Sequence, residues 1–202
     1  MTRPVACLLL LLLGGCASTG PVPEDRFYRL EAVHPEQMLP SPVLRGGLNV
    51  AYVQADPLRG GRAVLYSDSA QPLQLRRYHY EFWVDQPPRM LRRALTSYLR
   101  EAGIADSVVA ADGAGDSAYR LRLSLLRFEQ VLGGKSADVE VAVEATLSSG
   151  SGDSIVWTRV YERRRTSLSR QMHDTASAMQ AALADLFADL RADLVSSLAQ
   201  AR

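Results

Sequence analysis

The chain has 202 residues, and its 23 basic and 22 acidic side chains give a formal net charge of +1 at pH 7. This balance argues against a general nucleic-acid binder, which would carry a clear basic excess. The length is sufficient for one ordinary domain with a sizeable core.

The first twenty residues have the features of an export signal. Arg3 and the amino terminus supply positive charge, and residues 5–13 form an apolar run. At about 1.5 Å of rise per residue, this run reaches less than half of a roughly 30 Å hydrocarbon core, so it is too short to span a bilayer. A positive start, a short apolar core and small closing residues are typical of a secretory signal.

The end of this signal resembles the lipobox of bacterial lipoproteins. A leucine lies three places before Cys16, with two glycines between them. In that pathway, diacylglycerol is attached to the cysteine, the chain is cut before it, and the new amino terminus is acylated. We therefore predict a signal peptide over residues 1–15 and a lipid anchor on Cys16, which several acyl chains would make stable. The alternative is an ordinary signal peptide with a chance cysteine at its end.

Residues 16–25 are predicted to be a flexible lipidated tether, because they are mostly small or polar and include prolines. No aspartate follows Cys16, which by resemblance to lipoprotein sorting favours the periplasmic face of the outer membrane. Cys7 leaves with the signal and Cys16 carries lipid, so we expect no disulfide within the mature chain. Apart from the diacylglycerol and N-acyl lipid on Cys16, no cofactor is predicted.

Residues 26–202 are predicted to form a single periplasmic domain, and its first part has the pattern of β-structure. Leu48, Val50 and Tyr52 alternate with other residues and are expected on one face of a strand. A loop rich in proline and glycine is expected at 34–47, and the segment after Pro57 is expected to return as a hairpin partner. The predicted strands are residues 27–33, 48–56, 62–68 and 73–84.

An amphipathic helix is predicted from Pro87-Pro88 to a glycine C-cap at Gly103, because proline is tolerated in the first helical turn and glycine commonly closes a helix. Its apolar face contains Leu91, Leu95, Tyr98 and Ala102, and arginines lie opposite. A turn is expected at 111–117.

Three further strands are predicted, beginning near residues 118, 138 and 154. The first loses its alternation near Leu126, which indicates either a bulge or burial on both faces. The second has the clearest pattern in the chain and is expected to bury one face only. The residues expected on that face are Val139, Val141, Val143, Ala145 and Leu147.

The last helix is predicted from a cap at Asp174 to about Ala199. Asp185, Asp189 and Asp193 form an acidic row at four-residue spacing, which we interpret as a solvated face because converging metal ligands are lacking. The order strands, helix, strands, helix predicts an α+β fold, a two-layer sandwich with a mostly antiparallel sheet and both helices packed on one face.

The sequence offers no catalytic motif, and we predict that the protein is not an enzyme. The three histidines, His34, His79 and His173, lie outside any HExxH pattern, and CxxC, GxSxG and glycine-rich phosphate motifs are missing. No metal site is predicted. A lipid-anchored hydrolase using His79 or His173 is the least favoured alternative.

Two segments are candidate partner-binding surfaces. The run YHYEFW contains Tyr80, Phe82 and Trp83, which are either core and edge-shielding aromatics or an exposed binding surface. The run YERRRTSLSR contains Arg163, Arg164 and Arg165, which are either a solvated strand end or a contact for anionic lipid or an acidic partner.

The order of these motifs resembles the ABC-type transport auxiliary lipoproteins. The matching segments are the lipobox, FYRL, RAVLYSD, YHYEFWVDQPPRMLRRALTSYL, SAYRLRLSLLRFEQ, DVEVAVEATL, VWTRVYE and the long final helix, which together cover the mature chain. The sequence departs from the family where Val84-Asp85-Gln86 separates Trp83 from the helix-starting prolines and where Ser67 replaces a basic residue after Tyr66.

The resemblance implies a non-enzymatic accessory subunit of an intermembrane transport system for lipids or other hydrophobic compounds. The implied partners are the outer membrane through the lipid anchor, an MCE-domain protein and inner-membrane transporter components. A homo-oligomer is also possible, because an exposed aromatic edge favours self-association. The alternative is a lipoprotein that supports assembly of an outer-membrane barrel or of lipopolysaccharide.

Overall fold

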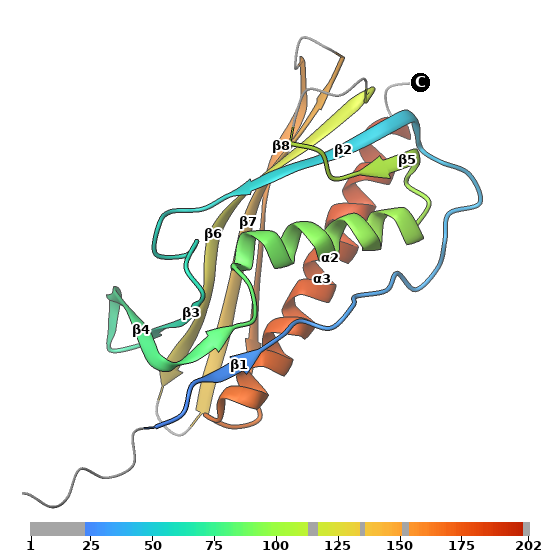
Figure 1. Cartoon of the computed structure of the whole chain (residues 1–202). Helices are drawn as coiled ribbons and strands as arrows, with labels where there is room; N and C mark the ends of the chain where they lie inside the picture. The colour runs from blue at the N-terminus through green and yellow to red at the C-terminus, as the bar shows by residue number, and fades with distance from the viewer. Residues whose placement is uncertain (1–22, 113–116, 134–135, 151–153, 200–202) are drawn as a thin grey trace, which may run out of the picture.

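The computed structural model describes residues 23–112, 117–133, 136–150 and 154–199 (Figure 1). The predicted signal peptide, Cys16 and most of the predicted tether lie outside the described residues. The strands and helices, in chain order, are β1 Arg26–Tyr28, β2 Leu44–Gln54, β3 Ala63–Asp68, β4 Gln71–Trp83, α2 Pro87–Glu101, β5 Ala105–Val109, β6 Tyr119–Gly133, β7 Ser136–Ser149, β8 Ser154–Thr166 and α3 Met172–Ala199.

Strand β6 organises the sheet. One of its edges pairs with β7 from Tyr119 to Gly133, and β7 in turn pairs with β8. Its other edge is divided: residues 119–124 pair with β2, and residues 129–132 pair with β3. The remaining strands extend these two groups, because β5 pairs with β2, and β4 joins β3 to β1.

The sheet is mixed, so the prediction of a mostly antiparallel sheet is wrong. The pairs β1–β4, β2–β5, β2–β6 and β3–β6 are parallel, and only β3–β4, β6–β7 and β7–β8 are antiparallel among the described strands. The expected hairpin between residues 48–56 and 62–68 is also wrong. Strands β2 and β3 each bind a different part of β6 instead of one another.

Strand β2 differs from its predicted element in both its start and its phase. It begins at Leu44, inside the expected loop, and Gly46 takes a φ of 97° that suits glycine. Its register against β6 shifts between Val50 and Val53, so Val53 is fully buried while Tyr52 is 50% exposed. The prediction that Tyr52 shares a face with Leu48 and Val50 is therefore wrong, because the bulge reverses the phase of the alternation.

Two further differences concern short strands. The first strand was expected over 27–33, but β1 ends at Tyr28. Beyond it the chain runs alongside α3, where the backbone N–H of Glu31 donates to Oε1 of Gln180 at 2.7 Å. Strand β5 was not predicted, because it has only five residues and follows directly after α2.

The clearest local patterns are confirmed. All five predicted inward residues of β7 have no exposed surface, but the expectation that β7 buries one face only is wrong, because Glu140, Ala142 and Ser148 on its other face are also buried. Strand β6 shifts register between Leu125 and Arg127, which is the bulge indicated near Leu126. Helix α2 ends as expected: the N–H of Gly103 donates to the Arg100 carbonyl and the N–H of Ile104 to the Leu99 carbonyl. With Gly103 at a φ of 66°, this is a Schellman motif.

Both helices cover one face of the sheet, as predicted (Figure 1). Their buried side chains belong to one hydrophobic cluster with the inward residues of the sheet, and the rings of Tyr98 in α2 and Phe187 in α3 lie 5.5 Å apart. Helix α3 begins at Met172, two residues before the predicted cap at Asp174. Asp174 lies in its first turn and is hydrogen-bonded to Ser169.

A buried polar chain holds the start of α3 beside β4 and β6. The hydroxyl of Tyr78 donates to Oε1 of Gln130 at 2.6 Å, and Nε2 of Gln130 donates to Oγ1 of Thr175 at 2.5 Å. Gln130 and Thr175 have no exposed surface, so these bonds satisfy groups that would otherwise be costly to bury.

Trp83 is the largest buried side chain at the end of β4. It is 1% exposed, and its ring centroid lies 5.2 Å from that of Phe128. We expect Trp83→Ala to lower the free energy of unfolding by about 3–5 kcal/mol, because it removes apolar contacts and leaves a cavity. Urea unfolding followed by circular dichroism measures this change.

The control is Leu73→Ala, since Leu73 is fully exposed. This variant is expected to unfold within about 0.5 kcal/mol of the wild-type protein. Equal stability of the Trp83→Ala variant and the wild-type protein would contradict the core role of Trp83.

Candidate functional site

An exposed group of aromatic side chains lies where β1 pairs with β4. Phe27 and Phe82 are register partners with ring centroids 5.8 Å apart, and Phe27 is 53% exposed. Tyr80, two residues before Phe82, is 39% exposed. We call Phe27, Tyr80 and Phe82 the aromatic patch. The guanidinium of Arg62 lies 5.4 Å from the centroid of the Phe27 ring.

The patch includes two of the three aromatics predicted to bind a partner. Tyr80 and Phe82 alternate with Glu81 and Trp83 along β4, and a strand sends alternate side chains to opposite faces. Trp83 is therefore directed into the core, and its interpretation as a partner contact is corrected to that of a core residue. Phe27 belongs to the patch but was not singled out from the sequence.

The opposite face of the β1–β4 pair is held by a buried carboxylate. Glu81 accepts a hydrogen bond from the hydroxyl of Tyr28 at 2.8 Å and forms a 2.8 Å ion pair with Arg26. Burial, together with the hydrogen bond to Glu81, raises the pKa of Tyr28 to about 12. These contacts fix β1 on β4 and so fix the position of Phe27.

A second candidate surface is a row of ion pairs between β8 and α3. Arg159 pairs with Asp193, Arg163 with Asp189 and Arg165 with Asp185. We call these six residues the Arg–Asp ladder. The pairs run in opposite directions along the strand and the helix, so the ladder fastens the edge strand β8 to α3.

Two arginines of the ladder, Arg163 and Arg165, were predicted to contact a partner or solvent, and its aspartates were predicted to form a solvated face. Arg163 and Arg165 face α3, and Arg164 faces the other side of the sheet, where it pairs with Asp138 and with Glu140. The acidic row of α3 is therefore paired with arginine. Each of the three predicted arginines has an intramolecular partner, and their contact with another molecule stays a prediction.

Asp193 is the most connected carboxylate of the ladder. Burial alone would raise its pKa, but hydrogen bonds with Arg159 and from Tyr161 outweigh burial, so the pKa lies below its ordinary value. For Tyr161, burial and the hydrogen bond to Asp193 raise the pKa well above its usual range. The neutral tyrosine and the charged aspartate are thus the forms that the folded state stabilises.

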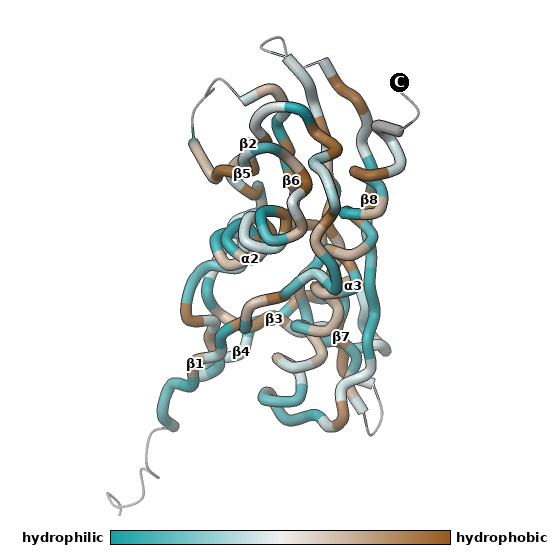
Figure 2. Tube along the Cα trace, turned by 90° about the vertical axis from the view of Figure 1, so that its right-hand side faces the viewer, coloured by the Kyte–Doolittle hydropathy of each residue, from teal (hydrophilic) through white to brown (hydrophobic). Residues whose placement is uncertain are grey.

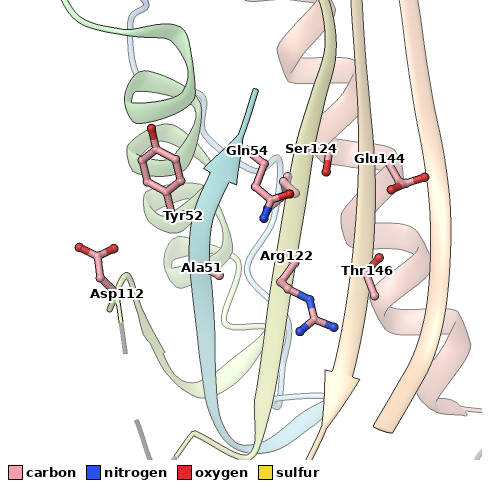
Figure 3. Close-up of a pocket in the computed structure, with 9 residues that line it drawn as sticks. Ala51, Tyr52, Gln54, Asp112, Arg122, Ser124, Glu144 and Thr146 are labelled. Atoms are coloured by element: carbon pink, nitrogen blue, oxygen red, sulfur yellow. The ribbon is translucent and has the colours of Figure 1, made fainter. Parts of the chain in front are cut away.

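A polar hollow of about 540 Å³ lies on the sheet face away from the helices (Figure 3). It contains charges of both signs and hydroxyl groups but no histidine or cysteine. The lining residues that Figure 3 labels are Ala51, Tyr52, Gln54, Asp112, Arg122, Ser124, Glu144 and Thr146.

The three histidines lie apart from one another. Nδ1 of His34 lies 2.7 Å from a carboxylate oxygen of Glu101, and His79 is exposed on β4. His173 lines a hollow between α3 and residues of β1 and the segment after it, among them Phe27 of the aromatic patch. Among the described residues, no three histidine, cysteine, aspartate or glutamate side chains are grouped as a metal ion requires. In the same part of the chain, neither helix is long and apolar enough to cross a bilayer.

Residues 28–193 match the family described as ABC-type transport auxiliary lipoprotein component. The chain belongs to this family. The match includes every described strand and helix, with β1 and the end of α3 included in part. The resemblance inferred from the order of the motifs is confirmed.

Solved structures share the fold of this auxiliary lipoprotein. A protein from Xanthomonas campestris has a TM-score of 0.74 at 21% identity, with 87% of this chain and 98% of that chain covered. An uncharacterized protein has a TM-score of 0.66 at 17% identity, covering 85% and 99%. A hypothetical protein from Chlamydia trachomatis has a TM-score of 0.53 at 9% identity, covering 77% and 99%. No curated protein matches the chain.

The auxiliary lipoprotein contains surface residues that sequence reasoning missed. Phe27 joins the aromatic patch, and Arg62 lies over its ring, only because β1 pairs in parallel with β4, and no local pattern indicates that pairing. Arg159 was also not predicted to belong to a surface site, although the sequence contains a pattern that could have indicated its pairing with α3. Arginines on one face of a strand and aspartates at four-residue spacing on the next helix are complementary rows.

We expect Asp193→Asn to lower the free energy of unfolding at pH 7 by about 0.5–1 kcal/mol, a small value because the ladder is partly exposed. A carboxylate with a depressed pKa in the folded state stabilises the fold above its unfolded pKa and loses that contribution as the pH falls through its folded value. The variant should therefore lose less stability than the wild type on acidification below about pH 4.

Urea unfolding at neutral and acid pH measures both changes. The control is Glu36→Gln, which removes an exposed carboxylate outside the ladder and should leave both values unchanged. If acidification lowered the free energy of unfolding equally in the Asp193→Asn and wild-type proteins, the Asp193 carboxylate would not contribute to the pH dependence of stability.

Proposed function

We propose that this protein is a non-enzymatic accessory subunit of an MCE/ABC-type system that moves lipids or other hydrophobic compounds between the inner and outer membranes. The observation that carries the proposal is the family match over residues 28–193, whose description joins ABC-type transport to a lipoprotein. The subunit is anchored by lipid on Cys16 to the periplasmic face of the outer membrane.

The composition of the surface supports a docking role over a catalytic one. The polar hollow lacks a histidine or cysteine beside its hydroxyl groups, and the three histidines are dispersed. Hydrolysis by a serine or cysteine enzyme requires a nucleophile and a base in hydrogen-bond reach. The partners proposed are an MCE-domain protein and inner-membrane transporter components.

The lipid anchor limits where such partners can bind. Residues 16–25 form a short tether, whose root-mean-square length is about 17 Å if it behaves as a flexible chain. The domain would then meet only partners that approach the outer membrane. A formal charge near zero gives no reason to expect a nucleic-acid partner.

Cys16→Ser is expected to abolish acylation and to release the protein from membranes, because serine cannot form the thioether to diacylglycerol. Fractionation of cells into soluble and membrane parts, with mass spectrometry of the amino terminus, measures both effects. A processed Cys16→Ser protein that remained in the membrane fraction would overturn the lipid-anchor assignment.

Crosslinking in intact cells followed by purification of the lipidated protein is expected to recover an MCE-domain protein. The matched control is Cys16→Ser, which should recover far less of it because the domain no longer stays at the membrane. An outer-membrane barrel as the dominant partner, with no MCE-domain protein, would contradict the proposed function and favour a role in barrel or lipopolysaccharide assembly.

A further inference from the structure

The aromatic patch lies at the end of the domain where the tether enters. Phe27 follows Cys16 by eleven residues, so the separation of the two is at most about 38 Å and about 18 Å on average for a flexible chain. Figures 1 and 2 both place β1 and β4 at the end of the domain away from the C-terminus. This step rests on the lipid anchor of the proposed function.

The chemistry of the patch suits the interface between lipid and water. Phe27 presents its ring to solvent and stacks on the half-buried ring of Phe82, and Tyr80 adds an exposed ring with a hydroxyl group. Arg62 lies over the Phe27 ring, with its backbone bonded to Trp83. Rings edged by hydroxyl and guanidinium groups are favoured at the level of lipid headgroups, where apolar and polar contacts are both satisfied.

The charges around the patch are of both signs. Arg26 is paired with Glu81 behind the patch, Arg29 is exposed, and Glu24 and Asp25 precede β1. Net attraction to anionic lipid is therefore small. Burial of the aromatic rings provides the driving force, at about 25 cal/mol for each Å² removed from water.

We propose that the aromatic patch inserts into the headgroup region of the bilayer that holds the lipid anchor. The β1–β4 end of the domain then lies on the membrane, and the end where β7 turns into β8 is directed into the periplasm. The patch acts as a second, reversible membrane contact that sets the orientation of the domain.

The test uses tryptophan as a contact probe for lipid. The lipidated full-length protein is purified from membranes and reconstituted into phosphatidylcholine vesicles with or without brominated acyl chains, which quench tryptophan on contact. The native Trp83 and Trp157 are 1% and 9% exposed and give the background. Phe27→Trp places the probe in the patch and keeps an aromatic ring there.

The matched control is Ile155→Trp, at a residue that is 64% exposed on β8. Ile155 lies beside Ser148, which pairs with Arg120, whereas β3 joins β6 from Glu129 onward. Phe82 pairs with Ala63, two residues before the β3 residue that pairs with Glu129, so the patch is level with about residue 127 and lies about 23 Å from Arg120 along β6. The control probe is therefore exposed but distant from the patch.

Bromination is expected to reduce the fluorescence added by Phe27→Trp at least about twofold and to leave that added by Ile155→Trp unchanged, because quenching needs contact with the lipid. An equal mixture of phosphatidylcholine and phosphatidylglycerol should give the same result, since the net charge of the patch is small. Tyr80→Trp serves as the second probe if Phe27→Trp lowers the melting temperature.

Three results would overturn the proposal. If the protein floats with the vesicles but the patch probes are unquenched, the membrane contact is wrong while the anchor stands. If the lipidated protein does not float, both are wrong. If the unquenched patch instead crosslinks to a periplasmic protein in cells, the patch is a protein-docking surface.

Discussion

The long antiparallel pairing of β6 with β7 is the constraint on which the rest of the structure depends. Because β7 occupies one edge of β6 and carries β8 on its far side, the other five strands reach the sheet through the second edge of β6. That edge is shared by β2 and β3, on either side of the bulge near Leu126. The β2 half supports α2, whereas the β3 half supports β4, β1 and the aromatic patch. The polar hollow beside β2 and the aromatic patch on β1 and β4 thus belong to different halves of one sheet.

Elements with strong local periodicity could be predicted from the sequence, but their pairing could not. Strand β7 and helix α2 have alternations that depend on neighbouring residues alone, and both were located correctly. Parallel pairing joins segments far apart in the chain, so nothing near β3 indicates that it binds β6 instead of β2. The exposure of Tyr52 follows from a bulge, which depends on how β2 fits against β6.

The same distinction applies to the candidate sites. Cys16 was assigned from a compact motif, since lipidation is read from a few adjacent residues. The role of Trp83 depends on which face of β4 packs inward, and composition alone left that choice open. Arg163 and Arg165 were interpreted as exposed although their aspartate partners were visible on the last helix. The pairing of the β8 arginines with the α3 aspartates could be predicted only with the knowledge that α3 lies over β8.

The entry of the tether at β1 determines how mechanical force enters the protein. If Cys16 carries the proposed lipid, a pull on it would act first on β1, which is held to β4 by register pairing, by the Phe27–Phe82 stack and by the contacts of Glu81. The load then passes through β4 and β3 into β6. Helix α3 is joined to this route at its start, because the backbone of Glu31 is bonded to Gln180 and Tyr78 of β4 reaches Thr175 through Gln130. With the proposed anchor, movement of the membrane would therefore load β1, β4 and the start of α3 before it reached the ladder between β8 and the end of α3.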